Sequence, residues 1–116
     1  MEFVGRIEKG LGVAGNLGYH TANLEKGKYE NAEEGVFAGK ALIDGVWYRA
    51  GIVVHSFNGK KKIEAHLLNF VGEIYDKEMK IVVAEKIRDF IYFANNEDLK
   101  KQIAADILFV ENKIIL

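Results

Sequence analysis

A carboxylate and an imidazole stand two residues apart in the segment KIEAHLL, residues 62–68. Successive side chains of a β-strand point to opposite faces, so Glu64 and His66 would share one face while Ile63 and Leu67 lie on the other. A carboxylate beside an imidazole can perform acid–base chemistry. The same alternation is also typical of a strand whose polar face is solvated, and the spacing alone leaves both interpretations open.

Two small oxygen-bearing side chains, Thr21 and Asn23, follow a glycine-rich stretch. Hard cations such as Mg²⁺ take oxygen ligands and keep waters and substrate phosphates in their remaining positions. The pair therefore suits a site for a metal-bound nucleotide. The alternative is that Asn23 only closes a turn.

The glycine-rich stretch itself, GLGVAG at residues 10–15, matches the dinucleotide fingerprint G-x-G-x-x-G. That fingerprint indicates a dinucleotide site only between a strand and a helix. A strand-like run precedes it, but residues 16–23 show no apolar repeat of helical period, which disfavours a Rossmann fold. Glycine costs chain entropy, so the loop still indicates a tight turn or a close approach of backbone to a ligand.

Other metal and nucleophile chemistry finds little support. The chain has no cysteine, which excludes disulfides and thiolate zinc sites. His20 and His55 are isolated in the sequence, and with His66 they form no H-x-x-x-H spacing, which disfavours a zinc hydrolase. We expect His20 and His55 to be surface residues.

Composition limits the classes of function. The chain has 116 residues, 49% hydrophobic and 28% charged, which is typical of one soluble domain over residues 1–116. Its net charge of -1 gives no electrostatic case for binding nucleic acid or an anionic membrane. Residues 1–10 lack the pattern of a secretory signal, and no apolar run is long enough to span a bilayer. We therefore expect a cytoplasmic monomer that binds neither nucleic acid nor membrane.

Two dipeptides predict tight hairpins in the middle of the chain. Asp44-Gly45 and Asn58-Gly59 supply the two positive φ angles that a type I′ turn requires, so three consecutive antiparallel strands should surround them. Further runs rich in Val, Ile and Phe lie at residues 3–9, 80–87 and, as a possible last strand, 108–116. The total is five or six strands.

One helix is predicted at about residues 97–108. Asn95 or Asn96 can cap its first turn, which is acidic as the helix dipole favours. Apolar residues recur every four positions along it: Leu99, Ile103 and Ile107. Several short strands with glycine turns and one late helix favour a small closed barrel over an open α/β sheet.

Several segments, taken in order, resemble the riboflavin kinase family, including the kinase module at the end of bifunctional FAD synthetases. The segments are GRIEKG, GNLGYHTANL, GVFA, IEAHLLNF, GEIYDKEMKI, IRDFIYF and EDLKKQIAADI. The family hallmarks are G-x-P-T-A-N, an E-x-H strand leading to L-x-D-F, a Y-G-K turn, an I-R segment ending in Phe, and a helix opening with E-x-L-x-x-Q-I. The resemblance runs from Phe3 to about Leu108, and the order and spacing of the pieces make it specific.

The resemblance implies a mainly β fold, a six-stranded antiparallel Greek-key barrel with one C-terminal α-helix packed on it. It also implies transfer of the γ-phosphoryl group of ATP, with Mg²⁺, to the 5′-hydroxyl of riboflavin, giving FMN. The implied partners are therefore the small molecules ATP and riboflavin.

The resemblance also implies roles for individual residues. Glu64 falls on the catalytic base of the family, and Thr21 and Asn23 fall on its metal and phosphate positions. Tyr75 lies in a segment near the nucleotide, and Arg88 lies in one near the flavin. The glycine-rich loop falls on a flap that covers the nucleotide, and its predicted nucleotide-binding glycines are Gly10, Gly12, Gly15 and Gly18.

The chain departs from the family pattern at several positions. His20 replaces a proline, Gly15 stands where the flap has arginine, and Phe90 replaces an acidic residue. Asn69 and Asp76 replace the Asp of L-x-D-F and the Gly of Y-G-K. Residues 52–59 are shorter than the family stretch N-I-G-x-x-P-T and lack its residues. Two further interpretations therefore stay open: a catalytically lapsed barrel that binds flavin or nucleotide as a sensor or carrier, and an unrelated small barrel that acts through protein contacts.

Overall fold

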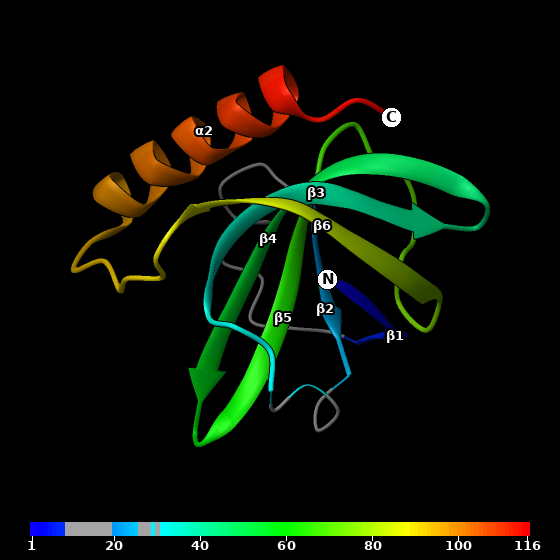
Figure 1. Cartoon of the computed structure of the whole chain (residues 1–116), viewed down its shortest axis with the longest axis horizontal. Helices are drawn as coiled ribbons and strands as arrows, with labels where there is room; N and C mark the ends of the chain where they lie inside the picture. The colour runs from blue at the N-terminus through cyan, green and yellow to red at the C-terminus, as the bar shows by residue number, and fades with distance from the viewer. Residues whose placement is uncertain (9–19, 26–28, 30) are drawn as a thin grey trace.

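A computed structural model of the chain describes residues 1–8, 20–25, 29 and 31–116. Within these residues, six antiparallel strands close into a barrel, and one helix packs on its outside (Figure 1). The elements are β1 (Glu2–Glu8), β2 (His20–Leu24), β3 (Gly35–Ile43), β4 (Val46–Phe57), β5 (Lys60–Leu67), β6 (Glu78–Arg88) and α2 (Asn96–Lys113). The predicted barrel with a C-terminal helix is confirmed.

The strand order around the barrel is β1-β2-β5-β4-β3-β6. Strands β3, β4 and β5 are joined by hairpins, and β6 returns to lie beside β3. Three hairpin-connected strands with a fourth beside the first form a Greek key. This order places β5 between β2 and β4, so residues from both neighbours lie beside the predicted Glu64–His66 pair.

Both predicted hairpin turns are present. Asp44 and Gly45 have φ angles of 51° and 78°, and Asn58 and Gly59 have 51° and 75°. Two successive positive φ angles define the type I′ turn, whose twist matches that of the flanking strands. Since the second turn pairs Phe57 with Lys60, it fixes the register of β4 on β5.

Two hydrophobic clusters hold the molecule together. The first fills the barrel and includes Ile63 and Leu67, the inward-facing residues of β5. The second lies between the outer wall of the barrel and α2, and includes Leu68 together with Ile103 and Ile107 of the helix. The outward-facing side of β5 is therefore partly covered by the rest of the chain.

Helix α2 begins as predicted but ends later. Asn95 is its N-cap, and its side-chain Oδ1 accepts a hydrogen bond of 2.9 Å from the backbone N–H of Asp98. The helix continues to Lys113, so the possible strand at 108–116 is wrong. Val110 is fully buried and extends the inward stripe of the helix, and this packing outweighs the β propensity of the segment. Within the described residues, no helix has the length and apolar character needed to cross a membrane.

Strand β2 was not expected as a separate element. It is short and follows the glycine-rich stretch, and the runs predicted as strands do not include its residues. Ala22 and Leu24 point into the barrel core, and the alternating residues Thr21 and Asn23 lie on the opposite face of the strand. This alternation over four residues was the signal that could have identified the strand.

Candidate functional site

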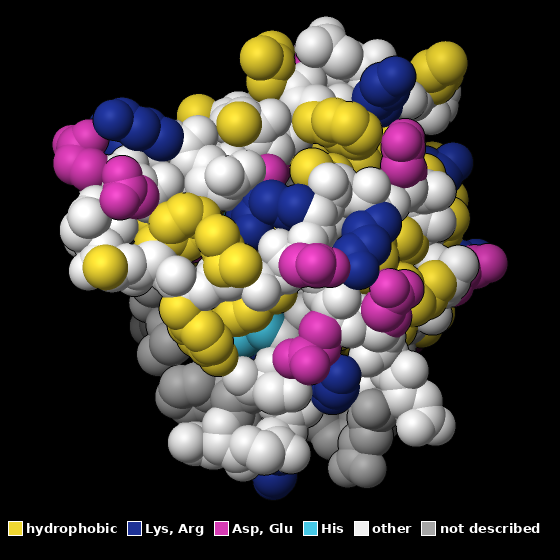
Figure 2. All heavy atoms as spheres, turned by 60° about the vertical axis from the view of Figure 1, so that its left-hand side comes forward, with side chains coloured by type: hydrophobic (Ala, Val, Ile, Leu, Met, Phe, Trp, Pro, Cys, Tyr) yellow, Lys and Arg dark blue, Asp and Glu magenta, His cyan; other side chains and the backbone are white. Residues whose placement is uncertain are grey.

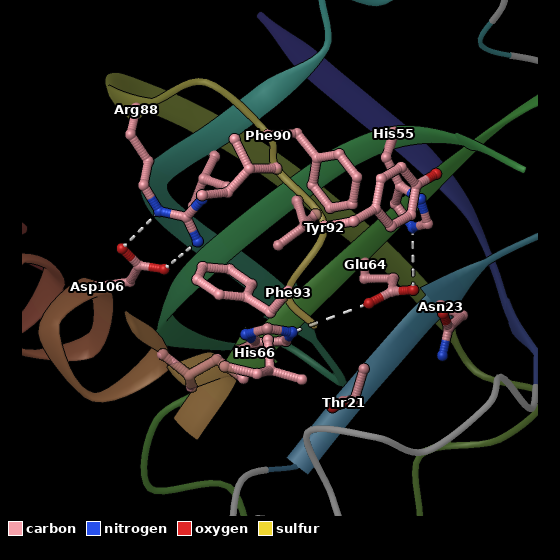
Figure 3. A pocket seen from close by; sticks show the side chains of 15 residues that line it. Thr21, Asn23, His55, Glu64, His66, Arg88, Phe90, Tyr92, Phe93 and Asp106 are labelled. Carbon is pink, nitrogen blue, oxygen red and sulfur yellow. Dashed lines mark hydrogen bonds and ion pairs between the residues drawn. The ribbon is translucent and has the colours of Figure 1, made fainter. Parts of the chain in front are cut away.

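A pocket of about 240 Å³ lies against the outer wall of the barrel. Strands β2, β4 and β5 form one side of it, and residues 88–93 together with helix α2 form the other (Figure 3). Figure 2 shows this side of the molecule, where hydrophobic side chains gather and a histidine is visible between them. The side chains that carry its polar chemistry are Thr21, Asn23, His55, Glu64, His66, Arg88 and Asp106.

The strand register brings three of the predicted site residues together. Asn23 of β2 is the direct cross-strand partner of Glu64, and Thr21 is the partner of His66. Directly opposed residues on one face of an antiparallel pair are near neighbours. Glu64, Thr21 and Asn23, predicted from segments more than forty residues apart in the chain, all line the same pocket.

Glu64 lies between two imidazoles. Nε2 of His55 is 3.3 Å from Oε1 of Glu64, and Nε2 of His66 is 3.9 Å from Oε2. The side chain of Glu64 is 21% exposed and that of His66 is 10% exposed, so the interpretation of this strand face as freely solvated is wrong. Burial raises the pKa of Glu64, but the hydrogen bond and charge of the two histidines outweigh burial and lower the pKa from 4.5 to about 2. The carboxylate is therefore ionised at neutral pH.

This lowered pKa predicts a pH-dependent contribution of Glu64 to stability. In the unfolded chain Glu64 titrates near 4.5, and in the folded protein it titrates near 2. The unfolded state thus takes up the proton first as the pH falls, so the stabilisation is present above the higher pKa and is lost towards the lower one. We expect the difference in unfolding free energy between wild type and Glu64→Gln to be larger at about pH 6 than at about pH 2.5. Urea denaturation at both pH values measures it, and an unchanged difference would contradict the assignment.

His55 lies in the site, and its expected place on the surface is wrong. Its side chain is 12% exposed and its ring stacks on Phe90, with centroids 4.7 Å apart. The signal was available in the Asn58-Gly59 turn. A type I′ turn there pairs Phe57 with Lys60, which places Val53 opposite Glu64 and His55 on the same face, diagonal to the carboxylate.

Thr21 and Asn23 offer oxygens that the protein does not use. Oγ1 of Thr21 and Oδ1 of Asn23 are buried and have no hydrogen-bond partner among the described residues. Buried polar atoms are nearly always paired, so such atoms in a pocket wall indicate a ligand. The glycines predicted to cover the nucleotide, at positions 10, 12, 15 and 18, lie outside the described residues.

Arg88 lines the pocket and is bound to helix α2. Its Nε and Nη2 donate to the two carboxylate oxygens of Asp106 at 3.1 and 2.9 Å, and its Nη1 donates to the backbone oxygen of Asp89. Gln102 also donates to Asp106, whose side chain is 7% exposed. Asp106 is not among the site residues predicted from the sequence. The sequence feature that could have identified Asp106 is its position on the apolar helix face with Ile103 and Ile107, because a buried carboxylate needs a partner.

Tyr75 does not line this pocket and is 41% exposed. Its role in nucleotide binding stays a prediction, as does that of Arg88 in flavin binding. Asp76, the residue after Tyr75, has a φ of 66°, a conformation that favours glycine. It occupies the glycine position of the Y-G-K turn. The backbone of the turn therefore retains the shape that the family pattern suggests, in spite of the substitution.

Comparison with known proteins identifies the family. Residues 1–114 match the family model "Flavokinase", described as riboflavin kinase. The chain belongs to the riboflavin kinase family. The resemblance inferred from the ordered sequence segments is thus confirmed.

Similar proteins include longer, bifunctional ones. A bifunctional riboflavin kinase/FMN adenylyltransferase of Pseudomonas fluorescens is 35% identical over 108 residues, which is 89% of this chain and 35% of that protein. A protein of the same description from Buchnera aphidicola subsp. Schizaphis graminum is 32% identical, over 92% of this chain and 36% of its own length. This riboflavin kinase family chain therefore spans about a third of the length of these relatives.

Two crystal structures resemble the fold. The riboflavin kinase of Trypanosoma brucei has a TM-score of 0.73 at 21% identity, and the match covers 96% of this chain and 77% of that one. A structure titled macrolide-efflux protein, from Streptococcus pneumoniae, has a TM-score of 0.86 at 25% identity, and the match covers 97% of this chain and 39% of that one. Both support the barrel fold of this riboflavin kinase family chain.

Proposed function

We propose that this chain transfers the γ-phosphoryl group of ATP to the 5′-hydroxyl of riboflavin, giving FMN. The observation that carries the proposal is the convergence of an ionised carboxylate, Glu64, with the unused oxygens of Thr21 and Asn23 in one pocket. Membership of the riboflavin kinase family supports the same reaction. The lapsed-barrel alternative is not favoured, because these residues are retained and lie together.

Glu64 would act on the hydroxyl that is phosphorylated. In the reaction the hydroxyl oxygen bonds to the γ-phosphorus, the bond from that phosphorus to its bridging oxygen breaks, and ADP leaves. Phosphoryl transfer proceeds through a loose transition state, so the enzyme contributes mainly positioning and charge stabilisation. A carboxylate with a pKa of about 2 is a weak base, suited to orienting the hydroxyl and accepting its proton late.

Thr21 and Asn23 fit the oxygen ligands that Mg²⁺ with ATP requires. Both are hard, neutral donors, and Mg²⁺ commonly keeps waters and substrate phosphates beside only one or two protein ligands. When bound, the metal would neutralise charge on the transferred phosphoryl group. The protein contributes the cross-strand placement of Asn23 beside Glu64.

The opposite wall of the pocket suits the flavin. Phe90, Tyr92 and Phe93 supply aromatic surface, and Leu99 and Ile103 of the helix region add apolar surface. Small-molecule pockets combine mostly apolar walls with a few placed polar groups. A flat tricyclic ring system would be accepted by such a wall while its ribityl chain reaches towards the polar side.

The experiment that tests the proposal is turnover. Purified protein is incubated with riboflavin, ATP and Mg²⁺, and riboflavin is separated from FMN by chromatography. Formation of FMN that depends on protein and ATP is expected. Tight flavin or nucleotide binding without FMN would instead support the lapsed-barrel alternative. The single-domain organisation, the monomeric state, the cytoplasmic location and the lack of nucleic-acid binding stay predictions.

Thr21→Ala and Asn23→Ala are expected to impair the use of Mg-ATP and to spare riboflavin binding. Each substitution removes one oxygen from the proposed metal position. We expect KM for Mg-ATP to rise by at least about 10-fold, since loss of a residue that only supports a metal ligand already costs about that much. The measurements are KM for Mg-ATP and, without nucleotide, the riboflavin affinity from flavin fluorescence. An equal loss of riboflavin affinity would mean that β2 is only a structural support of the pocket.

A further inference from the structure

We propose that His55 is a positioning residue that holds the carboxylate of Glu64 in its working orientation. The inference rests on the proposed function, because it concerns the same carboxylate. His55 lies in residues 52–59, the segment that departs from the family pattern in length and in sequence. The contact is therefore a feature of this chain that its family motifs do not contain.

The geometry of the contact carries the first step. His55 projects from β4, the strand next to β5, and its Nε2 is 3.3 Å from Oε1 of Glu64 (Figure 3). An ionised carboxylate can only accept hydrogen bonds, so the hydrogen of this bond is on Nε2. His66 lies further away, with 3.9 Å between its Nε2 and Oε2 of Glu64. His55 is thus the closer of the two imidazoles to the carboxylate.

The imidazole of His55 is itself held in place. Its ring stacks on Phe90 at 4.7 Å with an interplanar angle of 20°. Tyr92 packs edge-on against Phe90 at 4.9 Å, and its hydroxyl donates a 3.1 Å hydrogen bond to the backbone oxygen of Ser56, the next residue of β4. Residues 90–92 and β4 therefore hold the imidazole ring of His55 in place. A fixed ring can position the carboxylate of Glu64, whose side chain has several rotatable bonds.

The consequence is an effect on the chemical step. A carboxylate that loses this restraint can rotate away from the substrate hydroxyl, and small misplacements of a reacting group cost large factors in rate. Substrate affinity depends on other parts of the pocket, such as the oxygens of Thr21 and Asn23 and the aromatic wall. Loss of the His55 contact should therefore lower kcat and leave KM almost unchanged.

Two substitutions separate the hydrogen bond from the packing. His55→Phe keeps a flat ring against Phe90 and removes the donor, and we expect it to lower kcat by about 10- to 100-fold. His55→Gln gives up the stacked ring but keeps an N–H donor, and it should recover most of that loss. The KM values for riboflavin and Mg-ATP should change less than about threefold in His55→Phe, which keeps a ring against Phe90. Wild-type kcat in His55→Phe, or equal losses in the two variants, would overturn the inference.

A measurement without turnover keeps the inference distinct from the proposed function. In ¹⁵N NMR spectra of the folded protein, we expect hydrogen on Nε2 of His55, and we expect the ring nitrogen signals of His55 to shift in Glu64→Gln. Glu85→Gln, at an exposed position of β6, is the matched control and should leave them unchanged. Unshifted signals in Glu64→Gln would overturn the contact itself. An inactive wild type with shifted signals would remove the proposed function and the positioning role while leaving the contact in place.

Discussion

Glu64→Gln is expected to lower kcat for riboflavin phosphorylation by about 10²- to 10⁴-fold. The amide has the size and shape of the carboxylate but cannot accept the proton of the substrate hydroxyl. It also lacks the negative charge that the neighbouring imidazoles of His55 and His66 now stabilise. The measurement is the initial rate at saturating riboflavin and Mg-ATP, with FMN separated by chromatography.

The matched control for this prediction is Glu85→Gln. Glu85 is an exposed glutamate of β6 that does not line the pocket, and its substitution should leave kcat within about twofold of wild type. Circular dichroism and thermal unfolding confirm that both variants fold. If Glu64→Gln turns over at the wild-type rate under these conditions, Glu64 is not the residue that acts on the hydroxyl.

The parts of the fold that depend on local signals could be predicted from the sequence. The dipeptides Asp44-Gly45 and Asn58-Gly59 have the positive φ angles that only a few residue types accept readily, and both turns are present. Asn95 caps the helix because its short side chain reaches the backbone N–H three residues later. These signals act over two to four residues, so no knowledge of the rest of the chain was needed.

Competing local preferences explain the errors in the elements. The run 108–116 includes Phe109, Val110 and two isoleucines, yet its first six residues extend α2, because Val110 completes the apolar stripe that packs on the barrel. The end of the helix is also held by Arg49, whose Nε donates a 2.7 Å hydrogen bond to the backbone oxygen of Ile114. A contact between residues 65 positions apart cannot be read from propensity.

The candidate site could be predicted only where family motifs or strand alternation pointed to it. Glu64, Thr21 and Asn23 were found in this way, and the register of β2 on β5 places them together. His55 and Asp106 were missed, because each acts through a partner on another element. Strand register and helix docking bring such partners together, and neither follows from residue type alone.

Arg88→Met is expected to produce the largest loss of stability among the substitutions considered. The guanidinium makes a two-bond pair with Asp106, and methionine would keep the apolar stem while leaving that carboxylate with Gln102 as its remaining described donor. Removing one partner of a buried ion pair costs about 3–5 kcal/mol. Since the side chain of Arg88 is 21% exposed, solvent screening favours the low end, about 3 kcal/mol. For a chain of this size that corresponds to a fall in Tm of roughly 10–20 °C.

Lys86→Met is the matched control on the same strand. Lys86 pairs with Glu33 and Asp89, but all three side chains are at least 38% exposed, so solvent screens these pairs and the loss of Lys86 should destabilise the protein far less than the loss of Arg88. Thermal and urea unfolding of both variants measure the contrast.

A double variant tests why Arg88→Met is costly. If the cost arises from an uncompensated buried charge, then replacing both partners, in Arg88→Met/Asp106→Leu, should recover most of the lost stability, because no carboxylate is left without its partner. If the double variant is as unstable as Arg88→Met, then the ion pair stabilises the protein because it attaches β6 and residues 89–93 to α2. In that case the same double variant should also lose riboflavin affinity, because residues 89–93 and α2 together form the apolar side of the pocket that we propose for the flavin. If Arg88→Met destabilises the protein no more than Lys86→Met does, both explanations are contradicted. That result would favour the flavin-binding role of Arg88 that the family resemblance implies.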